Sequence, residues 1–324
     1  MAVRPATHAG SWYSSDRNKL GSQLEQFIGS TQVVPHARVI VSPHAGYAYC
    51  GPTMGKAYGA LDVSHVKTVF ILGPSHHMYF RDKALVSRFQ QLQTPLGNLH
   101  VDVKKTSELV KLKEFEYMDA DVDCDEHSLE MQFSMLHKVL SLRRIDISQV
   151  QVVPIMISHN STQVDQQLGQ TLGQYLLQRD CVFIVSSDFC HWGRRFNYTG
   201  YVGEKGEIEE ALKEDTEIES LTARSKLSHH QVPIWKSIEL LDKFGMELLS
   251  QPEPRDKYGL WKQYIEVTGN TVCGEKPIGV LLCGLGSMGP SRGVKFTWPA
   301  YSQSSRVGNV MESSVSYGAG YCTI

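Results

Sequence analysis

The chain has 324 residues, of which 41% are hydrophobic and 20% are charged, and its formal net charge is −2. This composition is ordinary for a soluble globular protein that can bury a sizeable core, and the near-neutral charge gives no electrostatic basis for binding nucleic acid or an anionic membrane. No run of 18 apolar residues is present and no signal peptide follows Met1, so we expect no membrane insertion and no secretion.

The seven cysteines indicate reduced thiols. They are scattered, odd in number and without C-x-x-C pairing. A disulfide framework or a zinc site would show regular spacing, whereas this distribution is typical of a reducing compartment. We therefore expect a cytoplasmic protein, with the nucleus as a second candidate compartment.

The first half of the chain predicts alternating helices and strands. Gly73 and Pro74 should end the second strand because proline cannot donate to a strand ladder. An acidic segment over 119–126 leads into a helix from 127 to about 140. The elements expected before it are a helix over 17–28, a strand over 38–42, a helix over 52–61, a strand over 69–72, and a peripheral pair of strands over 83–89 and 97–102.

The second half continues this alternation. Its expected elements are strands over 149–157, 181–187 and 278–282, helices over 164–177, 205–224, 232–249 and 258–267, and closing strands over 295–303 and 313–317. Alternating strands and helices predict an α/β fold with a mixed, largely parallel central sheet flanked by helices. No linker divides the chain, so we expect a single domain over 1–324, with a charged surface excursion near 204–228.

A glycine-rich motif after the predicted strand 278–282 does not indicate a nucleotide site. Residues 284–289 match G-x-G-x-x-G. However, Pro290 follows where a phosphate-binding helix should begin, and no acidic residue stands about 20 positions on in a strand–helix–strand setting. We therefore expect no nucleotide cofactor.

Three predicted strands each end in a polar turn that carries a histidine. The turns contain His44, the pair His76 and His77, and His191. Carboxyl ends of parallel strands meet at one edge of a sheet, where ligands bind, so we expect these turns to share a pocket. Because His76 and His77 are adjacent, their side chains should point to opposite sides, and only one should enter the pocket with His44.

Neutral imidazoles with open positions suit iron, copper or zinc. Spacing leaves the third ligand open among Asp188, Glu130 and Cys273. His127 and Glu130 lie one helical turn apart, which is a pattern found in carboxylate metal sites, although a pocket-lining role for His127 is the alternative. Ser186, Ser187, Asp188 and His191 also supply the residue types of a serine hydrolase, but they lack the G-x-S-x-G elbow.

Eight segments spread along the chain form a distinctive set. They are HAGSWY (8–13), PHAGY (43–47), ILGPSHH (71–77), DEHSLEM (125–131), VSSDFCHWG (185–193), CG (273–274), PIGVLL (277–282) and SSVSY (313–317). Together they resemble the MEMO family, the mediators of receptor-tyrosine-kinase-driven cell motility, over nearly the whole chain. The resemblance implies a fold similar to that of class III, LigB-type extradiol dioxygenases.

The same resemblance implies a set of site residues. The metal ligands would be His44, His76 and Cys273. His191 would be the acid/base histidine, positioned by Asp188 or its neighbours. The residues expected to line the pocket are Trp12, His77, His127 and Glu130.

The function that this resemblance implies is copper or iron binding in redox-linked signalling, cell motility or invasive growth, with a phosphotyrosine peptide or a signalling protein as partner. A dioxygenase uses two histidines and a carboxylate, whereas Cys273 brings a softer thiolate that favours Cu(I) and is itself oxidisable. Ring cleavage is therefore disfavoured, and whether the protein is an enzyme stays open. The alternatives are a non-catalytic phosphopeptide-binding adaptor and a non-haem iron extradiol dioxygenase.

Overall fold

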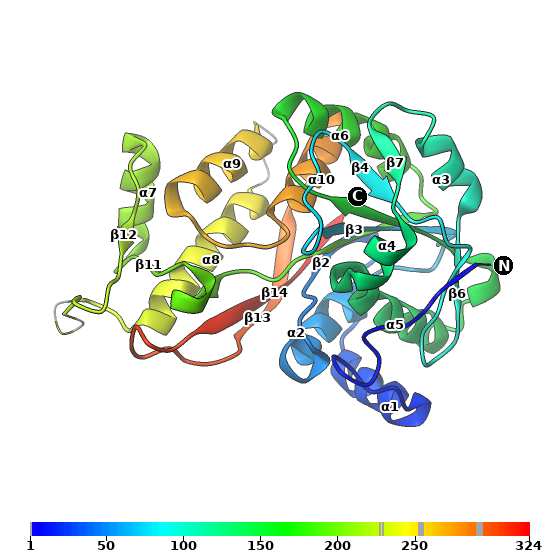
Figure 1. Ribbon diagram of the computed structural model, residues 1–324, viewed down its shortest axis with the longest axis horizontal. Coiled ribbons are helices and arrows are strands. Elements are labelled where there is room, and N and C mark those ends of the chain that lie inside the picture. Colours follow the sequence, from blue (N-terminus) through cyan, green and yellow to red (C-terminus); the bar gives the residue numbers. More distant parts are fainter. Residues whose placement is uncertain (1, 227, 229, 252–255, 290–293) are drawn as a thin grey trace.

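The computed structural model describes residues 2–226, 228, 230–251, 256–289 and 294–324, and these residues form an α/β fold around one large mixed sheet (Figure 1). The strands of this sheet are β1 (Val3–Arg4), β2 (Ala37–Ser42), β3 (Thr68–Pro74), β4 (Ala84–Val86), β5 (Gln91–Leu92), β6 (Leu99–Val101), β7 (Phe115–Tyr117), β8 (Gln151–Ile157), β9 (Cys181–Ser186), β10 (His191–Trp192), β13 (Phe296–Gln303) and β14 (Ser314–Thr323). A separate pair joins β11 (Gly200–Tyr201) to β12 (Glu219–Ser220).

The middle of the sheet is parallel. Strands run in the order β1-β5-β6-β8-β3-β9-β2-β14-β10, with β13 beside β14, and β4 beside β7 and β8. The neighbours β8, β3, β9 and β2 are parallel, and β14 closes onto β2 in the antiparallel sense. Every residue of β2, β3 and β9 is buried, as expected for parallel strands covered on both faces. The predicted fold class is confirmed.

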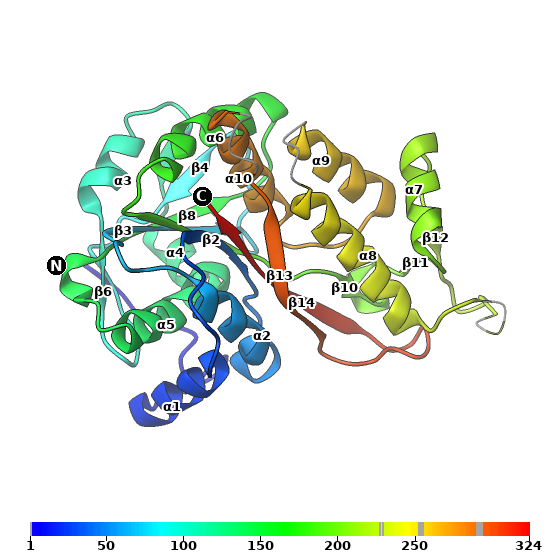
Figure 2. The ribbon, with the colours of Figure 1, turned by 180° about the vertical axis from the view of Figure 1, so that it is seen from behind.

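Helices cover both faces of this sheet (Figure 2). They are α1 (Arg17–Ile28), α2 (Tyr47–Ala60), α3 (Val103–Leu109), α4 (Ala120–Asp125), α5 (His127–Leu142), α6 (Thr162–Leu176), α7 (Lys205–Glu214), α8 (Ile234–Ser250), α9 (Lys257–Thr268) and α10 (Glu275–Ser287), with short 3-10 turns at Ile147–Gln149 and Arg194–Phe196. No helix in these described ranges is long and apolar enough to cross a membrane.

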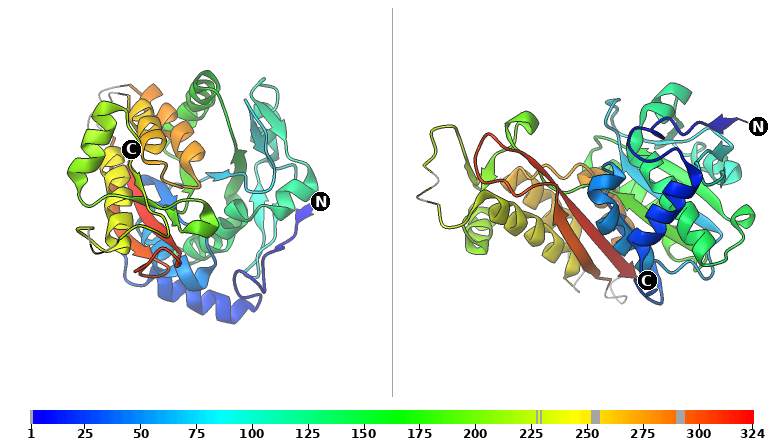
Figure 3. Two further views of the ribbon diagram at one scale, coloured as in Figure 1. Left: turned by 60° about the vertical axis from the view of Figure 1, so that its left-hand side comes forward. Right: turned by 90° about the horizontal axis from the view of Figure 1, so that it is seen from below.

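Alternation along the strands divides the interior into two cores. Val39 and Val41 of β2 join the core that holds apolar residues of α6, α8 and α10, whereas Ile40 between them joins the core that holds those of α1, α2 and α5. Figure 3 shows α7, α8 and α9 at one end of the molecule, beside the β13–β14 hairpin. The central strands are thereby fixed on both faces, which holds their carboxyl ends in place.

The predicted strand over 278–282 is wrong, because these residues lie inside helix α10. A short apolar run cannot distinguish a buried strand from a buried helix. Pro277 falls in the first turn of α10, where its missing N–H costs nothing. The G-x-G-x-x-G stretch consequently begins in the last turns of a helix rather than after a strand, while Pro290 lies outside the described residues.

Strand β3 also differs from the prediction, because it continues through Gly73 and Pro74 alongside β8. Pairing with β9 ends earlier, at Leu72, so Pro74 has a neighbouring strand on one side only and its missing N–H is tolerated. The turn that delivers the histidines therefore begins at Ser75.

Other elements also differ from the prediction. Helix α2 starts at Tyr47 rather than at Pro52, and the acidic segment forms its own short helix, α4. Strand β4 pairs with β7 and β8, while the peripheral hairpin joins β5 to β6. Helix α7 ends at Glu214, because Asp215 adopts a left-handed conformation with φ 55°, and the excursion continues into β12 instead of a longer helix.

Candidate metal centre

The carboxyl ends of three adjacent parallel strands converge on one site. Strand β9 lies between β2 and β3. His44 and His76 lie in the turns after β2 and β3, and His191 begins β10 just after the turn that follows β9. The structure thus brings together the three histidine-bearing turns that the sequence singled out. The loop between α9 and α10 closes the site from the side and contributes Cys273.

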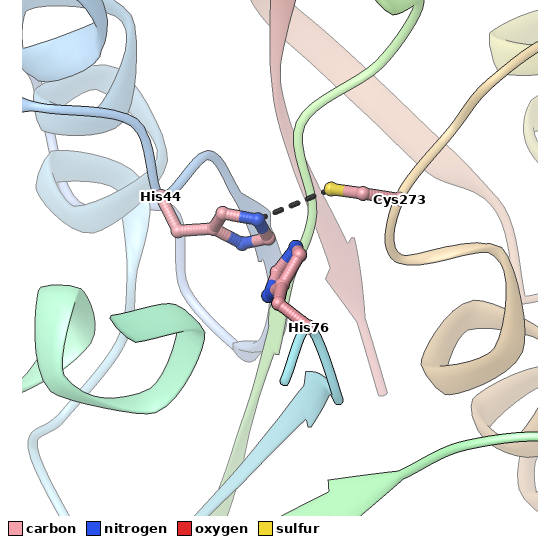
Figure 4. Close-up of side chains that lie close together, drawn as sticks. All are labelled: His44, His76 and Cys273. Atoms are coloured by element: carbon pink, nitrogen blue, oxygen red, sulfur yellow. Dashed lines mark hydrogen bonds between the residues drawn. The ribbon is translucent and has the colours of Figure 1, made fainter. Parts of the chain in front are cut away.

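His44, His76 and Cys273 form a compact group of ligand atoms (Figure 4). One ligand atom from each residue lies within 4.8 Å of the other two. The thiol sulfur of Cys273 is 3.1 Å from Nε2 of His44, and the two imidazole rings stand edge to face with centroids 5.1 Å apart. Two imidazole nitrogens and one sulfur are a donor set that suits Cu(I), zinc or iron, so the residues fit a metal ion.

Hydrogen bonding fixes which nitrogen of His44 faces the site. The Ser186 hydroxyl donates its one proton to the carbonyl of Ser128 at 2.6 Å and accepts from the Gln132 amide at 2.8 Å. Nδ1 of His44, 2.8 Å from the same hydroxyl oxygen, must therefore be the donor. The lone pair of Nε2 is left to face Cys273.

Glu126 holds His76 in the same way. Its carboxylate accepts from Nδ1 of His76 at 2.8 Å and from the His76 backbone N–H at 2.7 Å. It also accepts from the Ser128 N–H at the start of α5. Burial alone would raise the pKa of Glu126, but hydrogen bonding to His76 outweighs it and lowers the pKa to about 2. A carboxylate behind a histidine is the usual arrangement that orients a metal ligand.

Two members of this group, His44 and Cys273, are neutral when no metal is bound. Burial, together with the neighbouring His76, lowers the pKa of His44 well below its ordinary value. Burial and the negative charge of Asp188 raise the pKa of the Cys273 thiol. Cys273 therefore keeps its proton and donates it to Nε2 of His44, at the place where a metal ion would replace that proton.

His191 presents a free nitrogen to the pocket. Its Nδ1 lies 2.9 Å from the carbonyl of Phe189 and 3.1 Å from the carbonyl of Thr271, so Nδ1 carries the proton. Asp188 or its neighbours were expected to position His191, and the neighbour Phe189 makes this contact. The Asp188 carboxylate itself accepts from the backbone N–H of His44 at 2.8 Å.

The residues expected to line the pocket lie at different depths. Trp12 packs on His127 with centroids 4.4 Å apart, and His127 packs on His76 at 4.2 Å. Burial and the nearby His76 lower the pKa of His127 to about 3, so its imidazole is neutral. His77 is exposed and lies 6.1 Å from His127.

Glu130 is engaged away from the ligand group. Its carboxylate accepts from the guanidinium of Arg4, the backbone N–H of His8 and the hydroxyl of Tyr13. Among the described residues, three side-chain groups could hold a metal ion, and Glu130 belongs to none of them. These groups are His44, His76 and Cys273; His76, Glu126 and His127; and Asp188, His191 and Cys273. Glu130 thus anchors the N-terminal segment that carries Trp12, and the structure gives no support to a metal pair made with His127.

The two serines do not face His191 as a hydrolase nucleophile would. The Ser186 hydroxyl donates to the carbonyl of Ser128, and the Ser187 hydroxyl donates to the carbonyl of Asp188. Both side chains are fully buried. The hydrolase alternative therefore has no geometric support.

A cavity of about 480 Å³ opens in front of the ligand group. Its wall includes His76, His191, Phe196, Thr271, Cys273 and Lys276. Such a space could admit a small molecule or a short side chain to the ligands.

Sequence reasoning missed several residues that fix the site. Glu126 lies in the acidic segment that was predicted only to lead into a helix, although a carboxylate directly before His127 could have signalled its role. Gln132 and Thr271 reach the site from distant segments, and we find no sequence signal that would have identified them.

Comparisons with known proteins point to one family. The family model described as Memo-like protein matches residues 4–321. The MEMO1 family protein MHO1 of Saccharomyces cerevisiae is 54% identical, covering 100% of both chains. The MEMO1 family protein C4H3.04c of Schizosaccharomyces pombe is 39% identical over 98% of each chain, and the Homo sapiens Protein MEMO1 is 36% identical over 100% of this chain and 98% of its own.

Proposed function

The chain belongs to the Memo family, and from this premise we propose that it binds a copper or iron ion through His44, His76 and Cys273 in redox-linked signalling. The observation that carries the proposal is the pre-set donor group. Its three ligand atoms lie within 4.8 Å of one another, and buried partners fix both histidines so that each can offer Nε2.

The donor set favours copper within this proposal. A thiolate is a soft ligand, and soft ligands select Cu(I) over harder ions. A bound copper or iron ion would supply one-electron redox chemistry at this place. The surrounding residues would act on what enters the cavity, with His191 accepting a proton at Nε2, while His127 packs on His76 and Trp12 packs on His127.

The wider role is part of the same proposal. We propose, from the family resemblance, a role in redox-linked control of cell motility or invasive growth, with a phosphotyrosine peptide or a signalling protein as partner. We propose the cytoplasm as its compartment, with the nucleus as a second. The seven cysteines, all free thiols, support a reducing compartment.

A non-catalytic phosphopeptide-binding adaptor is the alternative function. It requires cationic histidines to hold an anion, whereas His44 and His127 are held neutral by burial. An extradiol dioxygenase is the third candidate, and Cys273 stands in its ligand group where a carboxylate would be needed. Oxygen uptake by the Fe(II)-loaded protein with a catechol would be the signature of that activity.

The proposal is tested by titrating the anaerobically reduced protein with Cu(I) and with Fe(II). We expect one ion per chain, with tight binding lost in Cys273→Ala and in a His44→Ala/His76→Ala variant. Cys283→Ala is the matched control, because Cys283 is a free thiol that lines a different cavity. Binding that persists in the ligand variants would contradict the proposal.

A further inference from the structure

A buried carboxylate lies behind His191 that the proposed metal site does not use. Asp242 of α8 is fully buried. Its Oδ1 accepts from the Cys190 N–H at 3.2 Å and from the Asn270 amide at 3.0 Å. Its Oδ2 accepts from the Tyr301 hydroxyl at 2.8 Å and from the Ser316 hydroxyl. Four donors are the compensation that a buried carboxylate needs.

One of these bonds leads directly to His191. The N–H of Cys190 and the carbonyl of Phe189 are the two ends of one peptide group. The N–H donates to Asp242, and the carbonyl accepts from Nδ1 of His191 at 2.9 Å. Asp242, the peptide group and the imidazole therefore form a continuous chain. A carboxylate at one end of such a chain strengthens the carbonyl acceptor at the other.

The second bond of Oδ1 reaches the other acceptor of His191. Asn270 precedes Thr271, whose carbonyl lies 3.1 Å from Nδ1 of His191. The Thr271 hydroxyl also accepts from the His191 N–H and donates to the His191 carbonyl, each at 2.8 Å. A single carboxylate oxygen thus holds both segments that supply acceptors to the imidazole.

We propose that Asp242 is a positioning residue that holds the His191 imidazole in the Nδ1–H tautomer, with the Nε2 lone pair open to the cavity. It acts through the 189–190 peptide group and through Asn270. What His191 does for a bound reactant rests on the proposed function. The positioning itself is a property of the metal-free chain, and it links the outer helix α8 to the site.

The test is the ¹⁵N NMR spectrum of the metal-free protein labelled in its histidine rings, with the His191 signals assigned by their loss in His191→Gln. Burial raises the pKa of Asp242 to about 6. The spectra are therefore recorded at about pH 8, where Asp242 is ionised and an ordinary histidine is neutral. We expect the wild-type chain to show the Nδ1–H tautomer at His191.

Two variants separate the positioning role from a general effect on folding. Asp242→Ala removes the acceptor for both the Cys190 N–H and the Asn270 amide, so the His191 imidazole should lose its preference for the Nδ1–H tautomer. Asp242→Asn should retain it, because the amide oxygen can replace Oδ1 while the amide N–H groups face two hydroxyls that can turn to accept. Tyr301→Phe is the matched control, since it removes only a contact to Oδ2.

A folded Asp242→Ala protein with an unchanged His191 tautomer would overturn the inference, even if its melting temperature fell. If that variant does not fold, Asn270→Ala tests the inference instead, because, of the two bonds to Oδ1 of Asp242, it removes only the one from Asn270. A shifted tautomer there supports the role and an unchanged one overturns it. Metal titration of the wild-type chain is independent of this result, so failure of the proposed function and failure of this inference are distinguishable.

Discussion

The sulfur of Cys273 lies 3.1 Å from Nε2 of His44, although 229 residues separate the two in the chain. Neither residue reaches the other through a local motif. His44 follows β2, while Cys273 comes from the loop that precedes α10. Their contact joins the central sheet to the C-terminal helices, and it places a protonated thiol against an imidazole lone pair where a metal ion would bind.

Glu126 should control metal affinity without touching the metal. Glu126→Gln removes the charge and one of the acceptors that hold His76. Loss of such a partner lowers metal affinity by about 10–100-fold. Competition with a chelator of known affinity measures the change. Asp125→Asn is the control, because Asp125 is an exposed neighbouring acid, and an equal loss in both variants would contradict a specific role for Glu126.

Trp12 should govern access rather than affinity. Its ring covers His127, which in turn covers His76. In Trp12→Ala we expect a chelator to strip the metal several-fold faster while the equilibrium affinity stays within about threefold, because no ligand is removed. Trp12→Phe keeps an aromatic cover and should behave nearly as the wild type. Stopped-flow mixing gives the rates of metal removal. Equal rates in all three proteins would contradict the claim that Trp12 limits access to the metal.

Much of the site could be predicted, because strand ends are local features. Apolar runs followed by polar turns located His44, His76 and His191 and predicted their convergence. Cys273 was one of three candidates for the third ligand, and only the family resemblance singled it out, since no spacing connects it to the histidines. Asp242, Gln132 and Thr271 act through hydrogen bonds between distant segments, which leave no pattern in the sequence.

The misassigned strand has a related cause. The run over 278–282, which has four hydrophobic residues and Gly279, suits a strand or a buried helix equally well, and tertiary packing decides. Here α10 packs closely on α6, where the backbone of Gly169 lies against Cys283 and Gly284. The close approach of α10 to α6 therefore depends on a glycine of α6, and no sequence pattern indicates that these two helices pack together.

This packing predicts opposite effects for two glycine substitutions. A Cβ at Gly169 would overlap Cys283 and the Gly284 backbone, so Gly169→Ala should lower the free energy of unfolding by about 1–3 kcal/mol through overpacking. A Cβ at Gly286 would meet no atom within 4 Å, so Gly286→Ala should raise it by about 0.5–1 kcal/mol by restricting the unfolded chain. Urea denaturation measures both, and equal effects would contradict the helix-to-helix contact.

The lowered pKa of the Glu130 carboxyl predicts that the free energy of unfolding depends on pH. Burial alone would raise its pKa, but the hydrogen bond from His8 and the charge of Arg4 outweigh it and lower the pKa from 4.5 to about 2. A lowered carboxyl pKa stabilises the fold fully above about pH 4.5, and this stabilisation is lost as the pH falls towards about 2.

Glu130→Gln should therefore reduce the free energy of unfolding by about 3 kcal/mol at neutral pH, because it removes one of the two carboxylates, Glu130 and Asp123, that pair with the buried Arg4. The difference from the wild type should shrink between about pH 4.5 and 2. Denaturation at a series of pH values measures it. Glu108→Gln, at an exposed position of α3, should change stability by less than about 0.5 kcal/mol. A difference that did not depend on pH would refute the ion pair.

X-ray absorption at the copper edge of the Cu(I)-loaded protein tests the central claim most directly, because it reports the atoms bound to the metal. We expect one sulfur and two imidazole nitrogens in the wild type. We also expect loss of the sulfur in Cys273→Ala and an unchanged spectrum in Cys283→Ala. A wild-type spectrum without sulfur, or a sulfur that persists when Cys273 is removed, would contradict the site.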